Sequence, residues 1–348
     1  MAIDWARGYA ATWHVYRVDA ETWADAQELP SVRAVSVSLD ASDRCVTKGS
    51  MTVDAPVGTD LEPGYYRVAM VAEQDGSAAE RQDVATLWCE STGGTVDHGS
   101  DELDVIGLSV LEPAKRECVP VGTYVPRGAD GPSWVADTLR GVLAAPVTVA
   151  DGGYELAEHV VIDPGTTIID AVWQVLDAGG WILRVAGDGT VAVVSMPTEP
   201  ALLLDRVGAR MVRPGIDRGR DLSTIPNRYY ATQGALTECA VNDDPDSPVS
   251  TVRRGHALDV VDTKPVRING ETLYGYCARK LEEASVYSRS YSYDREWWPD
   301  LMPHDIVRAA MPDVGMVGDL RVTRQSLACG HGIVVTERAE MEEALWQR

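Results

Sequence analysis

The sequence contains no phenylalanine among its 348 residues, although it carries 10 tryptophans and 13 tyrosines. Basic residues are also scarce, because 31 lysines and arginines are outnumbered by 53 aspartates and glutamates, for a net charge of −22. Non-specific binding to nucleic acid or to an anionic membrane needs clustered cations, so this composition argues against both. With 45% hydrophobic residues, the chain has enough apolar surface for a folded core, which excludes disorder as a whole.

Signals for export, membrane insertion and disulfide bonding are also lacking. The start, MAIDWARGYA, has no apolar stretch of the kind found in secretory signal peptides. The stretch 189–204 is interrupted by Pro197, Glu199 and Pro200, well short of the ~18 apolar residues of a membrane span. The six cysteines form no CxxC pair, and we expect free buried thiols at Cys45, Cys89, Cys118, Cys239, Cys277 and Cys329.

Motifs that mark enzymes of known mechanism are absent as well. The sequence has no GxxxxGK[ST] phosphate loop, GxSxG nucleophile elbow, HExxH zinc motif or GxGxxG dinucleotide motif. Cys329 and His331 are two residues apart but lack the further ligands of a zinc site. We therefore expect no catalytic residues, no cofactor and no bound metal.

Acidic residues are distributed unevenly along the chain. Residues 1–115 carry 8 basic and 20 acidic side chains, and residues 116–200 carry 4 and 11. Residues 201–348 are nearly balanced, with 19 basic and 22 acidic side chains. This difference predicts a different environment or partner for the C-terminal part.

Residues 1–115 read as a β domain. Ala34 to Leu39 alternates apolar and polar residues with the period of a half-buried strand, and Gly64 to Ala72 is a second strong strand. Asp75-Gly76 then supplies a hairpin turn, after which 84–90 can return antiparallel. Together these segments predict an antiparallel sheet or barrel.

Residues 116–200 change to a helical period. The segment 130–144 has an apolar stripe, and a second helix is predicted from an N-cap at Asp163 to a glycine stop at Gly179. A hairpin follows, with its turn at 187–189. This region is expected to be a small α/β domain.

Residues 201–348 return to strands, with one helix at about 270–284 that Asn269 is placed to cap. The segment from Glu337 to Arg348 is expected to be a short charged helix or a frayed end. The predicted fold class is therefore α+β and mainly β, with two antiparallel β-barrel domains and a small α/β domain inserted between them.

Three groups of residues stand out as candidate sites. Asp243, Asp244 and Asp246 form an acidic loop in which Pro245 and Pro248 favour a rigid, solvated turn, although clustered carboxylates also suit Ca²⁺. Arg253 and Arg254 follow this loop and can bridge to it or to a neighbouring subunit. Trp297 and Trp298 favour packing at a domain or subunit contact, with a sugar-stacking platform as the alternative.

The order of these segments resembles the tail hub, or baseplate hub, proteins of tailed bacteriophages, especially those of actinobacterial prophages. TWHVYRV and GYYRV with its Asp-Gly hairpin resemble the first tube-type β domain of that family, and LSVLEPAKRECVPVGTYVPRG resembles the passage into the middle domain. DLSTIPNRYYATQG, GETLYGYCARKLEEAS, SYSYDREWW and DLRVTRQSLACGHGIVVTE resemble the second β domain.

The resemblance implies a structural virion protein with no catalytic residues. In that family two tube-type β domains lie side by side, and three subunits form a ring that continues the tail tube. For this chain it implies a homotrimer at the tail tip, assembled in the host cytoplasm. Its neighbours would be a distal tail or tube protein above, a fibre or tip protein below and the tape measure within, with DNA passing through the ring.

The same resemblance gives the candidate residues a place. The acidic loop of Asp243, Asp244 and Asp246 is expected at the lumen or at an interface. Arg253, Arg254, Trp297 and Trp298 are expected at contacts between subunits. Two alternatives stay open at this point: a tail-associated cell-wall or polysaccharide hydrolase that uses a carboxylate pair, and a glycan-binding module that uses Trp297 and Trp298.

Overall fold

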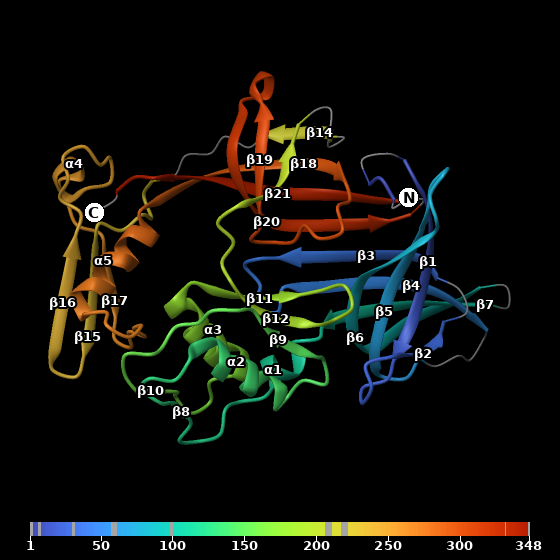
Figure 1. Cartoon of the computed structure of the whole chain (residues 1–348), viewed down its shortest axis with the longest axis horizontal. Coiled ribbons are helices and arrows are strands. Elements are labelled where there is room, and N and C mark those ends of the chain that lie inside the picture. Colours follow the sequence, from blue (N-terminus) through green and yellow to red (C-terminus); the bar gives the residue numbers. More distant parts are fainter. Residues whose placement is uncertain are drawn as a thin grey trace.

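The computed structural model is described here for residues 3–5, 8–29, 32–56, 61–97, 100–205, 211–216, 222–330 and 332–346. One large sheet dominates the molecule, and its main path runs in the order β14-β18-β21-β20-β3-β4-β7-β6-β5-β1-β2 (Figure 1). The prediction of an α+β, mainly β chain with an α/β insert is confirmed. No helix in the described ranges is both long and apolar enough to cross a bilayer.

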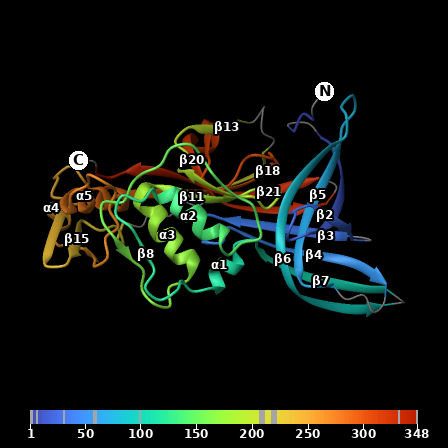
Figure 2. The same ribbon diagram turned by 60° about the horizontal axis from the view of Figure 1, so that its bottom comes forward.

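The N-terminal strands form one half of the large sheet. They are β1 (Ala10–Val18), β2 (Asp25–Glu28), β3 (Val32–Asp40), β4 (Thr47–Pro56), β5 (Gly64–Glu73), β6 (Glu80–Asp97) and β7 (Ser100–Ser109). This half curls, so that Val15 of β1 and Val37 of β3 share one buried apolar cluster with Tyr66 and Leu87 (Figure 2). The predicted alternation of β3 is confirmed, because Val35, Val37 and Leu39 are all buried.

The insert follows as a compact α/β unit. It contains α1 (Glu112–Arg116), β8 (Tyr124–Val125), α2 (Gly131–Arg140), β9 (Val147–Val149), β10 (Val160–Val161), α3 (Ile168–Gly179), β11 (Trp181–Val185) and β12 (Val191–Ser195). The apolar faces of α2 and α3 bury Val135, Leu139, Val172 and Leu176 against the β11–β12 hairpin. We call residues 112–195 the insert.

The remaining strands return to the large sheet. They are β13 (Pro200–Leu204), β14 (Met211–Ile216), β18 (Val286–Glu296), β19 (Ile306–Met311), β20 (Met316–Cys329) and β21 (Ile333–Ala344), with the short helix η1 (Pro312–Val314) between β19 and β20. β20 pairs antiparallel with β3 from Arg324↔Asp40 to Cys329↔Val35. The two β regions are therefore continuous through one pair of strands that lie far apart in sequence.

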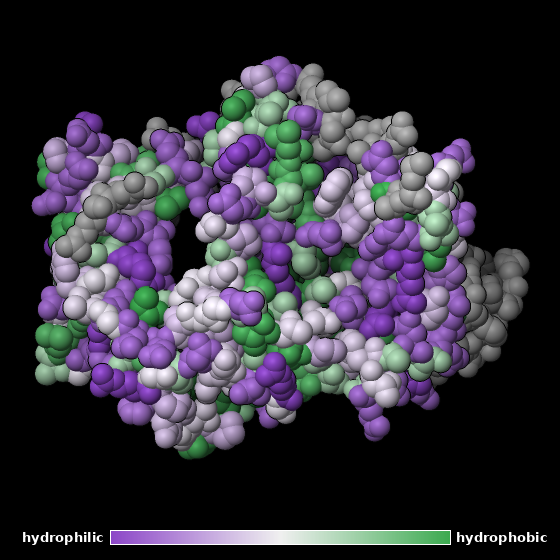
Figure 3. Space-filling model, viewed as in Figure 1, coloured by the Kyte–Doolittle hydropathy of each residue, from purple (hydrophilic) through white to green (hydrophobic). Residues whose placement is uncertain are grey.

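A separate small unit lies at one end of the molecule (Figure 1). It contains β15 (Arg228–Gln233), β16 (Leu236–Val241), α4 (Thr251–Arg254), β17 (Asp259–Asp262) and α5 (Leu273–Ala284). Leu273, Cys277 and Leu281 of α5 pack on Ala231 and Ala240 of the three-stranded sheet. An opening separates much of this unit from the large sheet in the space-filling view (Figure 3).

Three local sequence predictions are wrong. Helix α3 begins at Ile168 rather than near Asp163, because the Thr167 side chain accepts a hydrogen bond from the Asp170 backbone N–H. Helix α5 is capped by Thr272 rather than by Asn269. The expected helical or frayed C-terminal segment is largely strand, since β21 continues to Ala344 and pairs with β18 along its whole length.

We predict that Thr272→Ala accelerates hydrogen exchange of the first α5 amides, because the Thr272 hydroxyl accepts from Gly275 N–H at 3.0 Å. Loss of an N-cap destabilises a helix by about 1 kcal/mol. Asn269→Ala is the matched control, and it should leave these amides unchanged since Asn269 donates instead to Glu155. Equal acceleration in both variants would contradict the assignment of the cap.

Candidate functional surface and the contacts that hold it

A row of small hydroxyl side chains runs across the centre of the large sheet. Ser36 of β3 lies opposite Ser50 of β4, Ser38 of β3 lies opposite Ser326 of β20, and Ser326 lies opposite Thr336 of β21. Residues directly opposite one another share a face of the sheet. We call this surface the hydroxyl face, made of Ser36, Ser38, Ser50, Thr52, Ser326 and Thr336.

The hydroxyl face is the solvent side of this part of the sheet. Each of its side chains is exposed or half-buried, whereas the alternating residues, such as Val37, Met51 and Leu327, are buried. The period of two along β3, β4 and β20 places these hydroxyls outward and the apolar residues inward. Exposed apolar side chains adjoin the row on the same face. Ile106 of β7 lies directly opposite Ser50 and is 62% exposed, and Val334 of β21, opposite Ala328, is 47% exposed.

Many polar side chains on this face form hydrogen bonds or ion pairs with one another. Ser36 Oγ lies 2.8 Å from Ser50 Oγ, and the Thr336 hydroxyl donates to Asp294 Oδ1 at 2.7 Å. Arg324 Nε, on the same face, lies 3.7 Å from Asp40 Oδ2. The face therefore presents hydroxyls, a few apolar side chains and paired charges instead of a cationic field.

A buried ion pair holds the strands beneath this face. The side chains of Arg295 on β18 and Glu337 on β21 are 1% and 0% exposed, and Arg295 Nη2 lies 2.5 Å from Glu337 Oε2. Gln325 of β20 donates to the same oxygen at 2.9 Å, and Tyr293 donates its hydroxyl to Oε1. Burial and the Glu337 charge hold the pKa of Tyr293 well above its usual value. One carboxylate thus links β18, β20 and β21.

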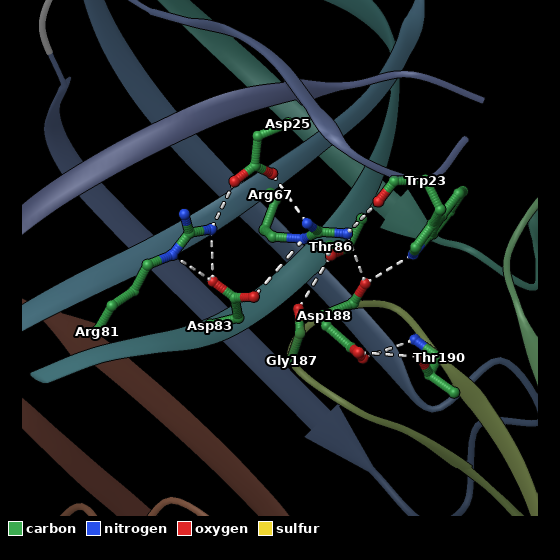
Figure 4. A network of polar contacts seen from close by, with 9 residues as sticks. All are labelled: Trp23, Asp25, Arg67, Arg81, Asp83, Thr86, Gly187, Asp188 and Thr190. Atoms are coloured by element: carbon green, nitrogen blue, oxygen red, sulfur yellow. Dashed lines mark hydrogen bonds and ion pairs between the residues drawn. The ribbon is translucent and has the colours of Figure 1, made fainter. Parts of the chain in front are cut away.

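A second polar network joins the insert to the N-terminal strands (Figure 4). Arg67 of β5 is 7% exposed, and its guanidinium donates to Asp25 Oδ1 at 2.8 Å and to the backbone carbonyl of Asp188 at 3.0 Å. The Trp23 indole N–H also donates to that carbonyl, at 2.8 Å. Asp188 lies in the turn between β11 and β12, so Arg67 and Trp23 hold the tip of this hairpin.

Glycine is required where the hairpin tip meets the strand. A Cβ on Gly187 would lie 1.8 Å from the backbone oxygen of Asp83. Gly189 has a φ of +82°, and a Cβ there would lie 2.8 Å from atoms of both Thr86 and Trp23. The sequence predicts the turn, but the reason for its glycines is the close approach of β6.

The structure places the acidic loop between β16 and α4, as a series of tight turns. Asp244 Oδ1 accepts the backbone N–H of Asp246 at 2.8 Å, and Asn242, which is fully buried, accepts the N–H of Asp244 at 3.3 Å. Asp243 and Asp246 are exposed. The described residues contain no group of three or more side chains arranged to hold a metal ion. A place for this loop at a lumen or interface stays a prediction.

Arg253 and Arg254 differ in their surroundings. Arg253 is exposed, while Arg254 donates to the backbone carbonyls of Leu222 and Ile225. Arg254 therefore holds a segment of its own chain, and within the described ranges no ion pair joins it to the acidic loop. Arg253 keeps its predicted place among contacts between subunits.

The two adjacent tryptophans do not form one surface. Trp297 is 6% exposed and packs edge-to-face on Trp5, with ring centroids 5.5 Å apart, whereas Trp298 is 36% exposed. Trp297 is buried within its own chain, which fits the packing role predicted for it, and a contact of Trp297 with another subunit stays a prediction. A sugar platform built from both rings is excluded for the same reason, while Trp298 keeps its predicted place.

The cysteines show no sign of catalytic activation. Burial raises the pKa of the Cys45 thiol to about 11 and those of Cys89 and Cys329 to about 12. All six thiols are free, but Cys118 is exposed and Cys239 half-buried, so the prediction of burial holds for four. His331, the other half of the predicted zinc hint, lies outside the described residues.

No protein-family model and no curated protein matches this chain. Several solved structures, however, superpose on this chain. The tail protein from Neisseria meningitidis MC58 superposes with a TM-score of 0.67 over 96% of this chain and 97% of its own, at 16% identity. The 43 kDa tail protein of prophage MuSo2 from Shewanella oneidensis gives a TM-score of 0.62 over 94% and 97%, at 11% identity. Prophage tail protein gp18 from Listeria monocytogenes EGD-e gives 0.54 over 94% of each chain, also at 11% identity.

The chain has the fold of phage tail proteins. The likeness spans nearly the whole of each chain, so it includes both β regions and the insert of the tail-protein fold. The tail-hub resemblance found in the sequence is confirmed at the level of fold. At 11–16% identity the fold is retained while most side chains differ.

We predict that Glu337→Gln lowers the free energy of unfolding by about 3–5 kcal/mol, because Arg295 would be left charged and buried without its carboxylate. Asp319→Asn, which removes the exposed partner of Arg308, is the matched control and should leave the melting temperature unchanged. Calorimetric melting of both variants measures the difference. A Glu337→Gln protein that melts like the control would contradict a structural role for the pair.

We predict that Gly187→Ala releases the β11–β12 tip from β6, since the new methyl group overlaps a backbone oxygen. Hydrogen exchange at 186–190 should become faster, together with exchange of the Trp23 indole N–H. Gly93→Ala, where a Cβ meets nothing within 4 Å, is the control. Unchanged exchange in Gly187→Ala would show that the junction adapts to the larger residue.

Proposed function

We propose that this chain is a structural protein of a phage-type tail tip, a hub that closes into a ring and continues the tail tube toward the host-contact apparatus. The observation that carries the proposal is the superposition on tail proteins over 94–96% of this chain. The proposed ring is a homotrimer. Its task is geometric, and it needs neither catalytic residues nor a cofactor.

The hydroxyl face supports a role in lining the conduit. DNA is retained by cations that release its counterions, so a surface along which DNA slides should offer few unpaired cations. Ser36, Ser50 and Ser326 carry no charge, and Arg324 lies against Asp40. The net charge of the chain is −22, so the protein as a whole weakly repels the negatively charged phosphates of DNA. In the proposed ring this face is directed at the lumen.

The partners follow from the position in the tail. A distal tail or tube protein lies above the proposed ring, a fibre or tip protein below it and the tape measure within it, and the chain is a component of the virion assembled in the host cytoplasm. The basic residues of the C-terminal part are less available to such partners than the sequence suggests. Lys264 and Arg267 pair with Asp163 and Glu158 of the insert.

The two alternatives have less support. The superposed structures are named as tail proteins, and nothing in them favours a cell-wall or polysaccharide hydrolase. A glycan-binding module would have to rely on Trp298 alone, because Trp297 is buried.

Mass in solution tests the proposal directly. Light scattering on the purified chain should give the mass of three copies. Electron microscopy of purified tails should show closed rings with a central hole. A chain that is absent from purified tails would refute the proposed function. Hydrolysis of peptidoglycan by the purified chain would favour the enzyme instead.

We predict that Ser326→Arg combined with Ser50→Arg slows DNA release from assembled particles, because six added cations per trimeric ring would contact phosphates in the lumen. The delay should shrink as salt is raised, since screening weakens the contact. Leu236→Arg, at a residue of β16 that is 54% exposed, is the matched control. Release at the unsubstituted rate in the double variant would place the hydroxyl face outside the conduit.

A further inference from the structure

The small unit is attached to the rest of the chain at two places. One is the end of α5, where Ser285 leads directly into β18 and accepts a hydrogen bond from the Leu345 N–H at 2.9 Å. The other is the insert, which the segment between β17 and α5 contacts. The opening in the space-filling view lies between these two attachments (Figures 1 and 3). The core of the small unit is an apolar cluster of its own, separate from those of the insert and the large sheet.

Apolar side chains hold the attachment at Ser285. Ile225, just before β15, and Val249, just before α4, pack in one buried cluster with Tyr287 of β18 and with Leu345. Apolar contacts carry no directional bond, so they tolerate a rotation of the unit better than hydrogen bonds do. We call Ser285 and these four residues the hinge.

Polar side chains hold the attachment to the insert. Glu158 of the insert accepts hydrogen bonds from Arg267 and from Gln233, and Lys264 pairs with Asp163. The Arg267 side chain is 11% exposed, and its Nε is buried without an acceptor in the described part of the chain. The charges of this attachment are therefore paired, but the hydrogen-bonding capacity of Arg267 is not fully used.

The backbone adds two hydrogen bonds to the same attachment. The Ala157 N–H donates to Arg267 O at 2.9 Å, and the Asn269 N–H donates to Glu155 O at 2.6 Å. Among the described residues, Val266 is the only buried side chain of the small unit in the apolar cluster of the insert. We call these side-chain and backbone contacts to the insert the latch. Its separation would expose little apolar surface, and water can replace its hydrogen bonds.

Packing between the insert and the small unit is loose. A cavity of about 260 Å³ lies among the latch residues Glu158, Asp163 and Lys264. A second cavity, of about 540 Å³, is lined by Trp173 of α3 and by Lys280 of α5. Interiors that hold one fixed arrangement are normally close-packed. This junction lacks such packing, as expected of two bodies that separate.

We propose that the small unit is a hinged arm, which turns about the hinge at Ser285 when the latch opens. Salt and competing charges weaken the contacts of the latch, whereas the hinge contains no ion pair that they could screen. In the open arrangement Glu158 and Trp173 become accessible, so a partner protein can bind one state and not the other. The inference concerns the chain itself and does not depend on its place in a tail.

Amide hydrogen exchange of Ala157 and Asn269 tests the latch, because both N–H groups donate across it. In the isolated chain, Glu158→Ala should accelerate exchange of these two amides by about tenfold or more, since the closed state is less populated. Sodium chloride at about 1 M, where the Debye length is about 3 Å, should accelerate it in the unsubstituted chain. The Leu345 amide and the α5 amides should keep their rates. Small-angle X-ray scattering should show a larger maximum dimension in both cases.

Any of three other results would overturn the inference. Unchanged exchange at Ala157 and Asn269 in Glu158→Ala would show that the polar contacts do not hold the unit closed. Equal acceleration throughout α5 would show that the unit unfolds instead of rotating, and faster exchange at an unchanged maximum dimension would show local fraying. Asp259→Ala, which removes the partner of Arg228 inside the small unit, is the matched control and should change neither measurement.

Discussion

The pairing of β3 with β20 is the contact on which the rest of the molecule depends. It joins strands that belong to opposite ends of the sequence, and it makes one sheet out of two β regions. Its register sets Ser38 against Ser326 and Val37 against Leu327, so a shift by one residue would place serines in the core and aliphatic side chains in water. The hydroxyl face exists only because this register holds.

Two polar clusters support that sheet, and one of them includes Gln325 of the β3–β20 pair itself. Glu337 ties β18 and β20 to β21 from inside the core, and Arg67 with Trp23 ties the insert to β5 and β6. Both clusters bury charge, and burial makes them demanding of geometry because an unpaired partner would be strongly destabilising. In a protein whose proposed task is shape, such contacts are expected to favour a single arrangement of the three parts.

The sequence was sufficient for the class and for most elements, since period-two alternation at 34–39 and the helical stripe of α3 are local signals. The sequence did not indicate which strands pair with one another. Neither the β3–β20 pairing nor the parallel pairing of β13 with β19 leaves a local signal in the sequence, because alternation indicates which residues are buried but not which strand lies alongside.

The helix caps at Thr167 and Thr272 were missed because Asp163 and Asn269 are equally good capping residues, and only the path of the chain distinguishes them. Trp297 was predicted to pack at a domain or subunit contact, but its partner Trp5, almost 300 residues earlier, could not be inferred from the sequence. The hydroxyl face was also missed, although the alternating serines of β3 were its one visible signal.

The central claim is that this chain closes into a ring whose lumen is lined by the hydroxyl face. A cryo-electron microscopy map of the chain within purified tails tests it most directly. The map should show three copies around a central hole, with Ser36, Ser50 and Ser326 at the surface of the lumen, and the lumen should be continuous with the tube above. A ring in which these serines lie on the outer surface, with the opposite side of the molecule at the hole, would contradict it.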